Sequence, residues 1–123
     1  MTGTILRRGL AALALLAALP LSAQQVSRGA GAELRVLDKL TGETVDMLLL
    51  TGETGNLGFL HVTMEECRFP VNNPAGDAYV ALVVRYGEDA VPAFAGWMIA
   101  SSPTLNAMDH PRYDVWALRC VDT

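Results

Sequence analysis

The segment at residues 32–54, AELRVLDKLTGETVDMLLLTGET, decides the fold class of this chain. Polar and apolar residues alternate through AELRVLDKL, and a period of two is typical of a β-strand with one buried face. The pentapeptide LTGET ends that run at residues 40–44 and returns at residues 50–54, after TVDMLLL. Each copy holds a glycine among polar residues, which is the chemistry of a tight turn. We therefore predict two hairpin turns between short strands, in preference to a duplicated functional loop.

The strand pattern continues toward the C-terminus. Residues 56–69, NLGFLHVTMEECRF, alternate as one strand until Glu65 and Glu66 interrupt the period, which predicts a β-bulge or a strand end. The run at residues 70–77 holds two prolines and a glycine and is expected to be a loop. Residues 78–86, AYVALVVRY, are apolar on both faces, which favours a strand in the middle of a sheet.

The last two strands are expected at residues 93–100 and 115–121, AFAGWMIA and VWALRCV. In the second of these, Trp116, Leu118 and Cys120 share one face if the alternation is regular. We therefore expect Trp116 to lie in the core beside the cysteine, and we expect Trp97 of the preceding strand to lie in the core as well.

The connection between these two strands, SSPTLNAMDHPRYD, predicts a short helical turn over residues 103–109. Ser102 is a good N-cap, Pro103 suits the first helical position, and Pro111 ends any helix begun there. The fold class is then all-β. It is a small single-domain sandwich or partly open barrel of roughly six to seven short strands, with one short helical turn and one disulfide.

The disulfide is predicted between Cys67 and Cys120, which are the only cysteines. Free thiols and metal ligands are the alternatives, but an exported chain meets an oxidising compartment. A bridge closing a loop of this length is worth about 4 kcal/mol in the chain-entropy model. The absence of a C-x-x-C pair gives a thioredoxin-type role no support.

Export is indicated by residues 1–25, MTGTILRRGLAALALLAALPLSAQQ, which have the three parts of a secretory signal peptide. Arg7 and Arg8 precede an apolar run that is half the roughly 20 residues of a membrane-spanning helix. Small residues follow, so we expect cleavage near Ala23. A retained membrane anchor is the alternative.

Cleavage there predicts a signal peptide at residues 1–23, a flexible mature N-terminus at residues 24–31 and one β-rich domain at residues 32–123. The product is expected in the periplasm, without a stable membrane span. No cysteine near the cleavage site offers an attachment point for a lipid anchor.

The charge of the mature chain excludes some partners. Loss of Arg7 and Arg8 leaves 7 Lys and Arg against 13 Asp and Glu, a net charge of −6. Acidic residues lie between the basic ones, so no basic stripe forms. Nucleic acid is therefore not an expected partner.

Catalytic patterns are weak. His110 lies near Ser101, Ser102, Asp109 and Asp114 in sequence, and these residue types can build a serine-hydrolase triad, but there is no G-x-S-x-G elbow. The two histidines, 49 residues apart, do not form a metal-ligand pattern. We therefore assign no catalytic residue, no metal site and no cofactor.

Binding is the stronger hypothesis for the connection before the last strand. Its candidate binding surface consists of Ser101, Ser102, His110, Arg112, Tyr113 and Asp114. Large amphipathic side chains of these types often anchor interfaces. The alternative is structural, with the serine capping, the histidine ending the turn and the arginine paired with a nearby aspartate.

Three blocks of the chain resemble a known bacterial family. They are LDKLTGETVDMLLLTGETGNLGFLHVTMEECRFP, NPAGDAYVALVV and FAGWMIASSPTLNAMDHPRYDVWALRC. Together they resemble the domain-of-unknown-function family DUF-2155, found mainly in alphaproteobacteria, over about residues 34–120. Both cysteines fall where that family has them. The resemblance implies an exported, envelope-facing protein and implies no activity, cofactor or catalytic residue.

The function that we predict is a non-enzymatic binding or adaptor module of the periplasm, with an envelope protein or assembly as its partner. One alternative is a small hydrolase that acts on a cell-wall or lipid substrate with His110 as the base. Another is a carrier of an apolar ligand between the sheets. Oligomeric state is left open.

Overall fold

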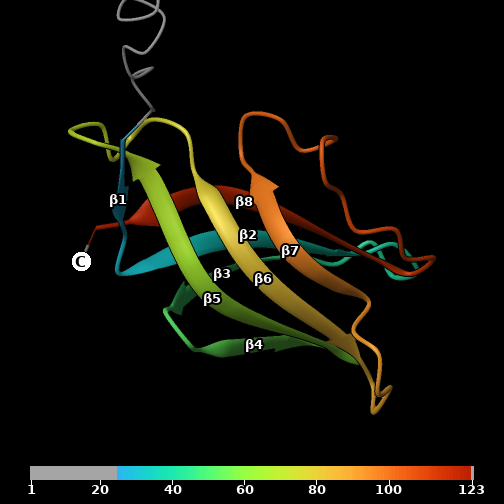
Figure 1. Cartoon of the computed structure of the whole chain (residues 1–123). Coiled ribbons are helices and arrows are strands. Elements are labelled where there is room, and N and C mark those ends of the chain that lie inside the picture. Colours follow the sequence, from blue (N-terminus) through green and yellow to red (C-terminus); the bar gives the residue numbers. More distant parts are fainter. Residues whose placement is uncertain (1–24, 123) are drawn as a thin grey trace, which may run out of the picture.

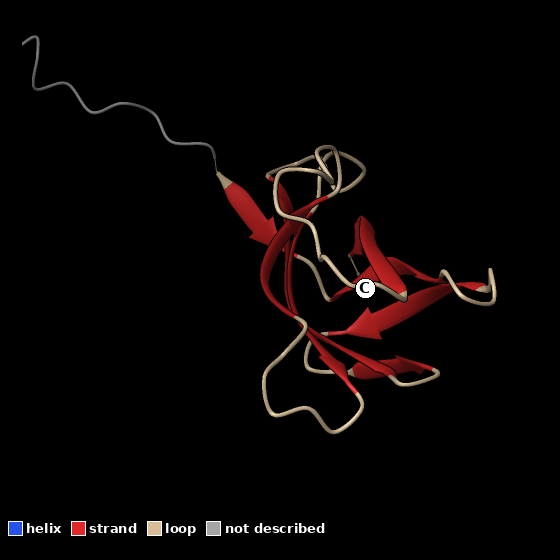
Figure 2. Ribbon diagram, turned by 90° about the vertical axis from the view of Figure 1, so that its right-hand side faces the viewer, coloured by secondary structure: helices blue, strands red, loops and turns tan. Residues whose placement is uncertain are grey.

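The computed structural model describes residues 25–122, and that part of the chain forms strands and loops without a helix (Figures 1 and 2). The eight strands are β1 (Val26–Arg28), β2 (Gly31–Asp38), β3 (Thr44–Leu50), β4 (Thr54–Leu57), β5 (Leu60–Pro70), β6 (Tyr79–Tyr86), β7 (Phe94–Ile99) and β8 (Tyr113–Val121). The all-β prediction is confirmed. No helix among these residues is long and apolar enough to cross a membrane.

The strands form two antiparallel sheets that face each other, with β5, β6 and β7 in front and β2, β3 and β8 behind in Figure 1. The front sheet has the order β1-β5-β6-β7, and β4 also pairs with β5. Strand β4 lies along the beginning of β5 and β1 along its end, both on the edge away from β6. The back sheet has the order β3-β2-β8.

The hydrophobic core lies between the two sheets. Alternation along each strand directs one side chain in two inward, which is why a period of two in the sequence marks the core. The largest fully buried side chains are Leu34, Val36, Leu60, Val62, Met64, Cys67, Val80, Leu82, Val84 and Tyr113. These side chains fill the space between the sheets.

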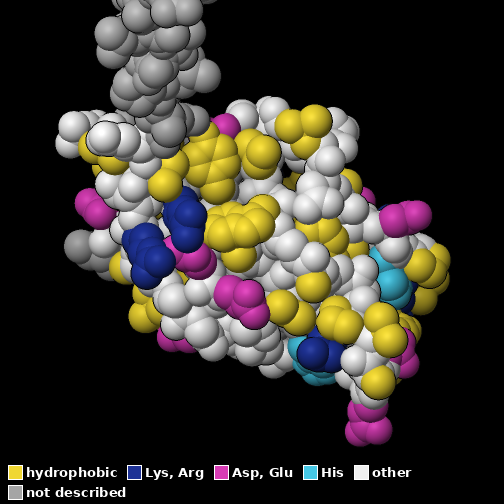
Figure 3. Space-filling model, in the orientation of Figure 1, with side chains coloured by type: hydrophobic (Ala, Val, Ile, Leu, Met, Phe, Trp, Pro, Cys, Tyr) yellow, Lys and Arg dark blue, Asp and Glu magenta, His cyan; other side chains and the backbone are white. Residues whose placement is uncertain are grey.

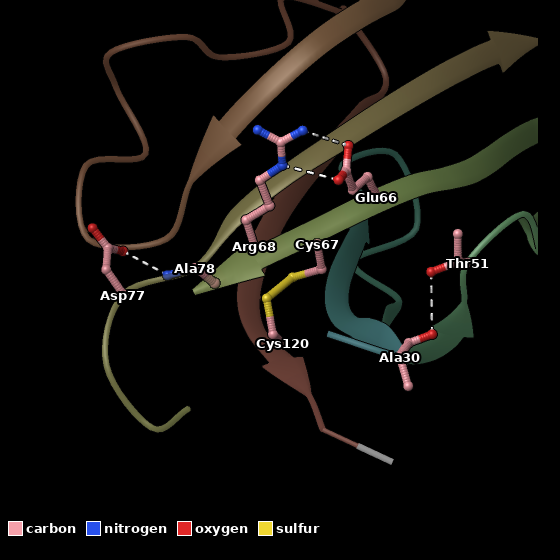
Figure 4. Close-up of a disulfide and its surroundings, with 8 residues drawn as sticks. All are labelled: Ala30, Thr51, Glu66, Cys67, Arg68, Asp77, Ala78 and Cys120. Carbon is pink, nitrogen blue, oxygen red and sulfur yellow. Dashed lines mark hydrogen bonds and ion pairs between the residues drawn. A yellow bond between two sulfur atoms is a disulfide. The ribbon is translucent and has the colours of Figure 1, made fainter. Parts of the chain in front are cut away.

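The disulfide prediction is also confirmed. Cys67 of β5 and Cys120 of β8 are bonded, with their Cα atoms 5.7 Å apart (Figure 4). Both side chains are buried, and the bond joins the front sheet to the back sheet. No cysteine in the described part of the chain is free.

The two LTGET turns have different roles. The first joins β2 to β3 as a hairpin, as predicted, because these strands pair along their length. The second does not close a hairpin: β3 lies in the back sheet and β4 in the front sheet. Gly42 and Gly52 both have a positive φ, so the shared sequence reflects shared backbone geometry.

The single strand expected at residues 56–69 is two strands. A two-residue turn at Gly58 and Phe59 separates β4 from β5, with Leu57 opposite Leu60. Gly58 has a φ of 56°, which a glycine adopts without steric cost. The predicted interruption of the period is confirmed as a bulge, since the register of β5 on β6 shifts between Met64 and Glu66.

The prediction that Trp116, Leu118 and Cys120 share one face of the last strand is wrong. The register of β8 on β2 shifts so that Arg119 opposes Glu33 and Ala117 opposes Leu34, which leaves Leu118 as an extra residue. Cys120 therefore shares the buried face with Ala117, and Trp116 lies half-buried on the outer face.

The helical turn expected over residues 103–109 is absent. Leu105 N donates to Ser102 O as one isolated turn. Asn106 Nδ2 then donates to Trp97 O over 2.7 Å, and Met108 is buried in the core. These contacts hold the segment open along the edge of β7, so the N-cap and the proline do not start a helix.

The N-terminal stretch expected to be flexible, residues 24–31, contains a paired strand. In β1, Val26 opposes Pro70 and Arg28 opposes Arg68. Gly29 N also donates to Cys67 O. The predicted signal peptide at residues 1–23 lies outside the described residues.

Candidate functional site

A shallow groove on the outer face of the front sheet is the candidate functional site. Its lining comes from β1, β5, β6 and β7, and consists of Val26, Arg68, Tyr79, Trp97 and Ile99. Its volume is about 330 Å³. Figure 3 shows this face, with apolar side chains gathered beside basic and acidic ones near the end of β5 and the beginning of β6.

The register of the strands places these side chains together. Arg28, Arg68, Tyr79 and Ile99 oppose one another in one row across four strands. The next row runs from Glu66 through Ala81 to Trp97. The rows are adjacent and on the same face because side chains two residues apart in a strand point the same way.

Arg68 spans the groove from β5 toward β7. Its Cζ atom lies 5.0 Å from the centroid of the Trp97 ring, a cation–π contact. The strand between them carries only the small Ala81 in the row of Trp97, which leaves room for the guanidinium to cross. Trp97 is 38% exposed, so part of the indole remains open to solvent.

Glu66 holds two arginines at the edge of the groove. It accepts hydrogen bonds from Arg68 Nε at 2.9 Å and Nη2 at 3.2 Å (Figure 4), and Arg28 Nε lies 2.6 Å from the same carboxylate. The hydrogen bond from Arg68 holds the pKa of Glu66 below its usual range, against burial, and the charge of Arg28 acts in the same direction. One carboxylate thus pairs with two guanidinium groups, and the exposed Glu65 that precedes it in β5 adds a second negative charge to this edge.

The predicted binding residues divide into two groups. Ser101 lies after β7, where its N and Oγ atoms donate to the two oxygens of Asp77 over 2.9 and 2.5 Å. Ser102 N donates to Ile99 O in the same turn. Burial acts to raise the pKa of Asp77, but the hydrogen bonds from Ser101 and Ala78 together lower it. These serines follow Ile99 in sequence but do not line the groove.

His110, Arg112 and Tyr113 form the second group, at the other end of β6. The His110 ring packs against Tyr86 with the ring planes tilted by 40° and the centroids 4.8 Å apart, and its Nδ1 accepts from Arg112 N at 3.1 Å and Tyr113 N at 3.2 Å. Arg112 is bound to Asp38 through Nε and Nη2. Tyr113 is fully buried, and its hydroxyl accepts from Phe59 N at 3.2 Å. This group connects loops to the core, and its binding role stays a prediction.

The separation of the two groups bears on the hydrolase hypothesis. Ser101 lies near Tyr79 and His110 on Tyr86, at opposite ends of β6, which is a separation of about 23 Å at ~3.3 Å per residue. His110 Nδ1 is occupied by backbone donors. Asp114 is half-buried on the face of β8 opposite to Tyr113. The structure therefore brings no Ser–His–Asp arrangement together from these residues.

Sequence reasoning missed the groove. It placed both tryptophans in the core, whereas Trp97 alternates with the buried Phe94 and Met98 and so faces outward. The alternation in AFAGWMIA could have shown this, since Phe and Met mark the inner face. Arg68 and Tyr79 carried no comparable signal, because their meeting depends on the register of β5 on β6.

The family described as "Uncharacterized protein conserved in bacteria (DUF2155)" matches residues 32–120. The chain belongs to this family. The matched range contains Arg68, Tyr79, Trp97 and Ile99 of the groove and both disulfide cysteines, while β1 precedes it.

The chain is also similar to "Uncharacterized protein RP359" of Rickettsia prowazekii (strain Madrid E). The two are 28% identical over 87 residues, which cover 68% of this chain and 56% of the relative. The chain therefore spans little more than half the length of this relative. No solved structure matches.

Proposed function

We propose that this DUF2155 protein is an exported, non-enzymatic module of the cell envelope that binds a protein partner through the Trp97 groove. The observation that carries the proposal is the exposed indole of Trp97, held against Arg68 and open on the groove. Tryptophan and arginine are the residues most enriched among interface hot spots.

The position of Trp97 supports binding in preference to packing. A side chain of this size stabilises a fold by burial, and here it leaves over a third of its surface in water while smaller side chains fill the core. Tyr79 and Ile99 extend the apolar surface beside it. A partner that covers the groove gains that apolar area without a rearrangement of the sheet.

Export is supported by two features. Residues 1–23 have the pattern of a signal peptide, and the buried Cys67–Cys120 disulfide is a bond that persists in oxidising compartments. A periplasmic location accounts for both.

The groove accounts for the structure better than the alternative functions do. The apolar-carrier hypothesis needs space between the sheets, and that space holds close-packed side chains. The hydrolase hypothesis needs His110 near a serine, and the predicted serines lie at the other end of β6.

Export is tested with a fusion of the full chain to alkaline phosphatase that lacks its own signal peptide. That reporter is active only where its disulfides form. We expect activity from the full-chain fusion and none from a matched fusion that begins at Gln24. Equal activity of the two fusions would contradict export through this signal.

Binding is tested by photo-crosslinking in the producing bacterium, with p-benzoylphenylalanine in place of Trp97. Val91, 78% exposed in the loop between β6 and β7, is the matched control position. We expect a protein adduct from position 97 and none from position 91. Adducts at neither position, or equally at both, would remove the groove as the binding site.

A further inference from the structure

The back sheet ends in a strand with one open edge. β3 is the first strand in the order β3-β2-β8, so its backbone pairs with β2 on one side only. Asp38 N donates to Glu43 O, which continues this ladder past the beginning of β3. Backbone groups alternate in direction along a strand, so every second residue points away from β2. These residues are Thr44, Asp46 and Leu48.

The outward-pointing residues are open to solvent. Thr44 and Asp46 are exposed, and Leu48 is 60% exposed. Among the described residues, no backbone group bonds to their free side. The open stretch ends at Leu50, whose N donates to Glu53 Oε2 and whose O accepts from Glu53 N. Residues 44–48 therefore present unpaired N–H and C=O groups in a regular row.

The other sheet edges are partly closed or shorter. At the edge of β7, Asn106 Nδ2 donates to Trp97 O and Ser102 N donates to Ile99 O. Along β8, the residues that point away from β2 are buried, namely Tyr113, Val115 and Ala117. β1 and β4 have three and four residues. With seven residues, β3 is the longest open edge in the described part of the chain.

β3 carries none of the usual protection of an edge strand. Soluble proteins block such edges with lysines, prolines, bulges or very short strands. The sequence of β3 is TVDMLLL, and it pairs with β2 without a shift in register. Its one charged side chain, Asp46, is bound to Arg35 Nε and Nη2 at 2.8 and 3.0 Å. A regular edge of this kind is a template for a further strand.

Two acidic residues flank this edge. Glu43 immediately precedes β3, and Glu53 follows it at the corner that leads to β4. Both are exposed, and neither forms an ion pair among the described residues. A strand that carries basic residues near its ends complements this arrangement.

Basic side chains near β3 do not cancel this charge. Arg35 and Arg119 are already in ion pairs with carboxylates of their own sheet face. Lys39 lies in the turn before β3, and its Nζ donates to a carbonyl of the loop before β8. His61 and Arg85 oppose each other on the front sheet. One lysine therefore faces two unpaired glutamates, and the surroundings of the edge stay acidic.

We propose that β3 is a docking edge for an extended segment of a partner protein, which adds to the back sheet as a fourth strand. The backbone groups of residues 44–48 bond to this segment. Its apolar side chains lie beside Leu48 and Leu50, which is 44% exposed, and its basic residues lie toward Glu43 and Glu53. The site belongs to the other sheet than the Trp97 groove, so it stands or fails independently of that groove.

A second copy of this chain fits the edge less well. The two-fold antiparallel pairing that uses Thr44, Asp46 and Leu48 of both copies places Asp46 directly opposite Asp46. Like charges in that position destabilise a strand pair. A shifted register leaves part of the free row unpaired. The partner strand is therefore expected to come from a different protein.

The test is photo-crosslinking of the full chain in the producing bacterium, with p-benzoylphenylalanine in place of Thr44. The substitution changes the side chain and leaves the backbone N–H in place. Val91, 78% exposed in the loop between β6 and β7, is the control position. We expect an adduct with another protein from position 44 and none from position 91. Mass spectrometry should locate the crosslink in a segment of alternating apolar residues flanked by lysine or arginine.

A pair of substitutions at Leu48 separates strand addition from a side-chain contact. Leu48→Pro removes an N–H that points away from β2, so the β2–β3 ladder keeps its bonds while the proline ring obstructs an added strand. Leu48→Thr keeps the N–H. We expect the position-44 adduct to fall by at least about tenfold in Leu48→Pro, because a carbonyl of the partner loses its donor. In Leu48→Thr most of the adduct should remain.

Urea midpoints of the purified variants show whether Leu48→Pro is folded. If proline lowers the midpoint more than threonine does, Glu43→Lys replaces it as the test, since that change leaves the backbone of β3 intact. We expect Glu43→Lys to weaken the position-44 adduct. Glu88→Lys, the same change at an exposed residue of the β6–β7 loop, should leave the adduct unchanged.

Three results would overturn the inference: no adduct at position 44, equal adducts in folded Leu48→Pro and Leu48→Thr, or an adduct of the chain with itself. Crosslinking at position 97 is scored separately. An adduct at position 97 without one at position 44 keeps the groove as a binding site and removes only the β3 edge.

Discussion

Arg112 forms a two-point ion pair with Asp38, with its Nε and Nη2 atoms 3.2 Å and 3.0 Å from the two carboxylate oxygens. Asp38 is the one charged side chain buried among the described residues, and Leu40 N donates to its Oδ1 as well. The pair joins the end of β2 to the residue before β8. The disulfide ties the other end of β8 to β5, so both ends of the last strand are held.

The Asp38 carboxylate makes the stability of the folded chain depend on pH in the acid range. The hydrogen bond from Arg112 lowers its pKa, burial opposes this, and the bond from Leu40 adds to the lowering. A carboxyl whose pKa is lower in the folded chain stabilises it above the unfolded value, about 3.9, and this contribution is lost as the pH falls through the lowered pKa. We expect Asp38→Asn to lower the urea midpoint at pH 7. The difference from the original chain should shrink below about pH 4. A difference that stays constant with pH would contradict this.

Removal of the disulfide should destabilise the chain strongly. Cys67 and Cys120 are 53 residues apart in sequence. We expect Cys67→Ser to lower the free energy of unfolding by about 2–5 kcal/mol, because the unfolded chain regains the freedom of that loop. Urea denaturation measures this loss of free energy. A reductant should lower the urea midpoint of the original chain and should leave the urea midpoint of Cys67→Ser unchanged. An original chain insensitive to reductant would contradict the prediction.

Gly58→Ala should destabilise the β4–β5 turn for two reasons. Gly58 has a positive φ, and a Cβ there would lie 2.5 Å from the Tyr113 hydroxyl oxygen. The backbone alone accounts for about 1–2 kcal/mol. Gly42→Ala is the matched control, since Gly42 has a φ of 78° with open space around it. The cost should be larger at Gly58, and Tyr113→Phe should relieve part of it in a double-mutant cycle. Equal losses of stability at Gly58 and Gly42 would show that an added Cβ at Gly58 does not clash with the Tyr113 hydroxyl.

His110 should act through its acceptor nitrogen. Its Nδ1 accepts from the backbone N–H groups of Arg112 and Tyr113. We expect His110→Ala to cost about 1 kcal/mol, because partly buried donors lose their partner. His110→Asn keeps an oxygen near that position and should cost less. Thermal unfolding of the two variants measures this, and an equal loss in both would show that the contact of the ring with Tyr86, and not the acceptor nitrogen, makes the main contribution.

The sequence alone was sufficient for the fold class, because the period of two and the turn glycines are local properties of the chain. The bulge at Glu65 was predictable for the same reason, as an interruption of that period. The disulfide could be predicted from the number of cysteines, since the two cysteines of an exported chain can form an intrachain bond only with each other.

Features that depend on register needed the tertiary structure. The extra residue at Leu118 reverses which face of β8 carries Cys120, and no local pattern announces it. The helix expected at residues 103–109 does not form, because Asn106 and Met108 make contacts with parts of the fold that are distant in sequence. The groove arose in the same way, since Arg68, Tyr79 and Trp97 come from three strands and meet only once the sheet is formed. Periodicity shows which way a side chain points, but neighbours across strands are set by long-range pairing.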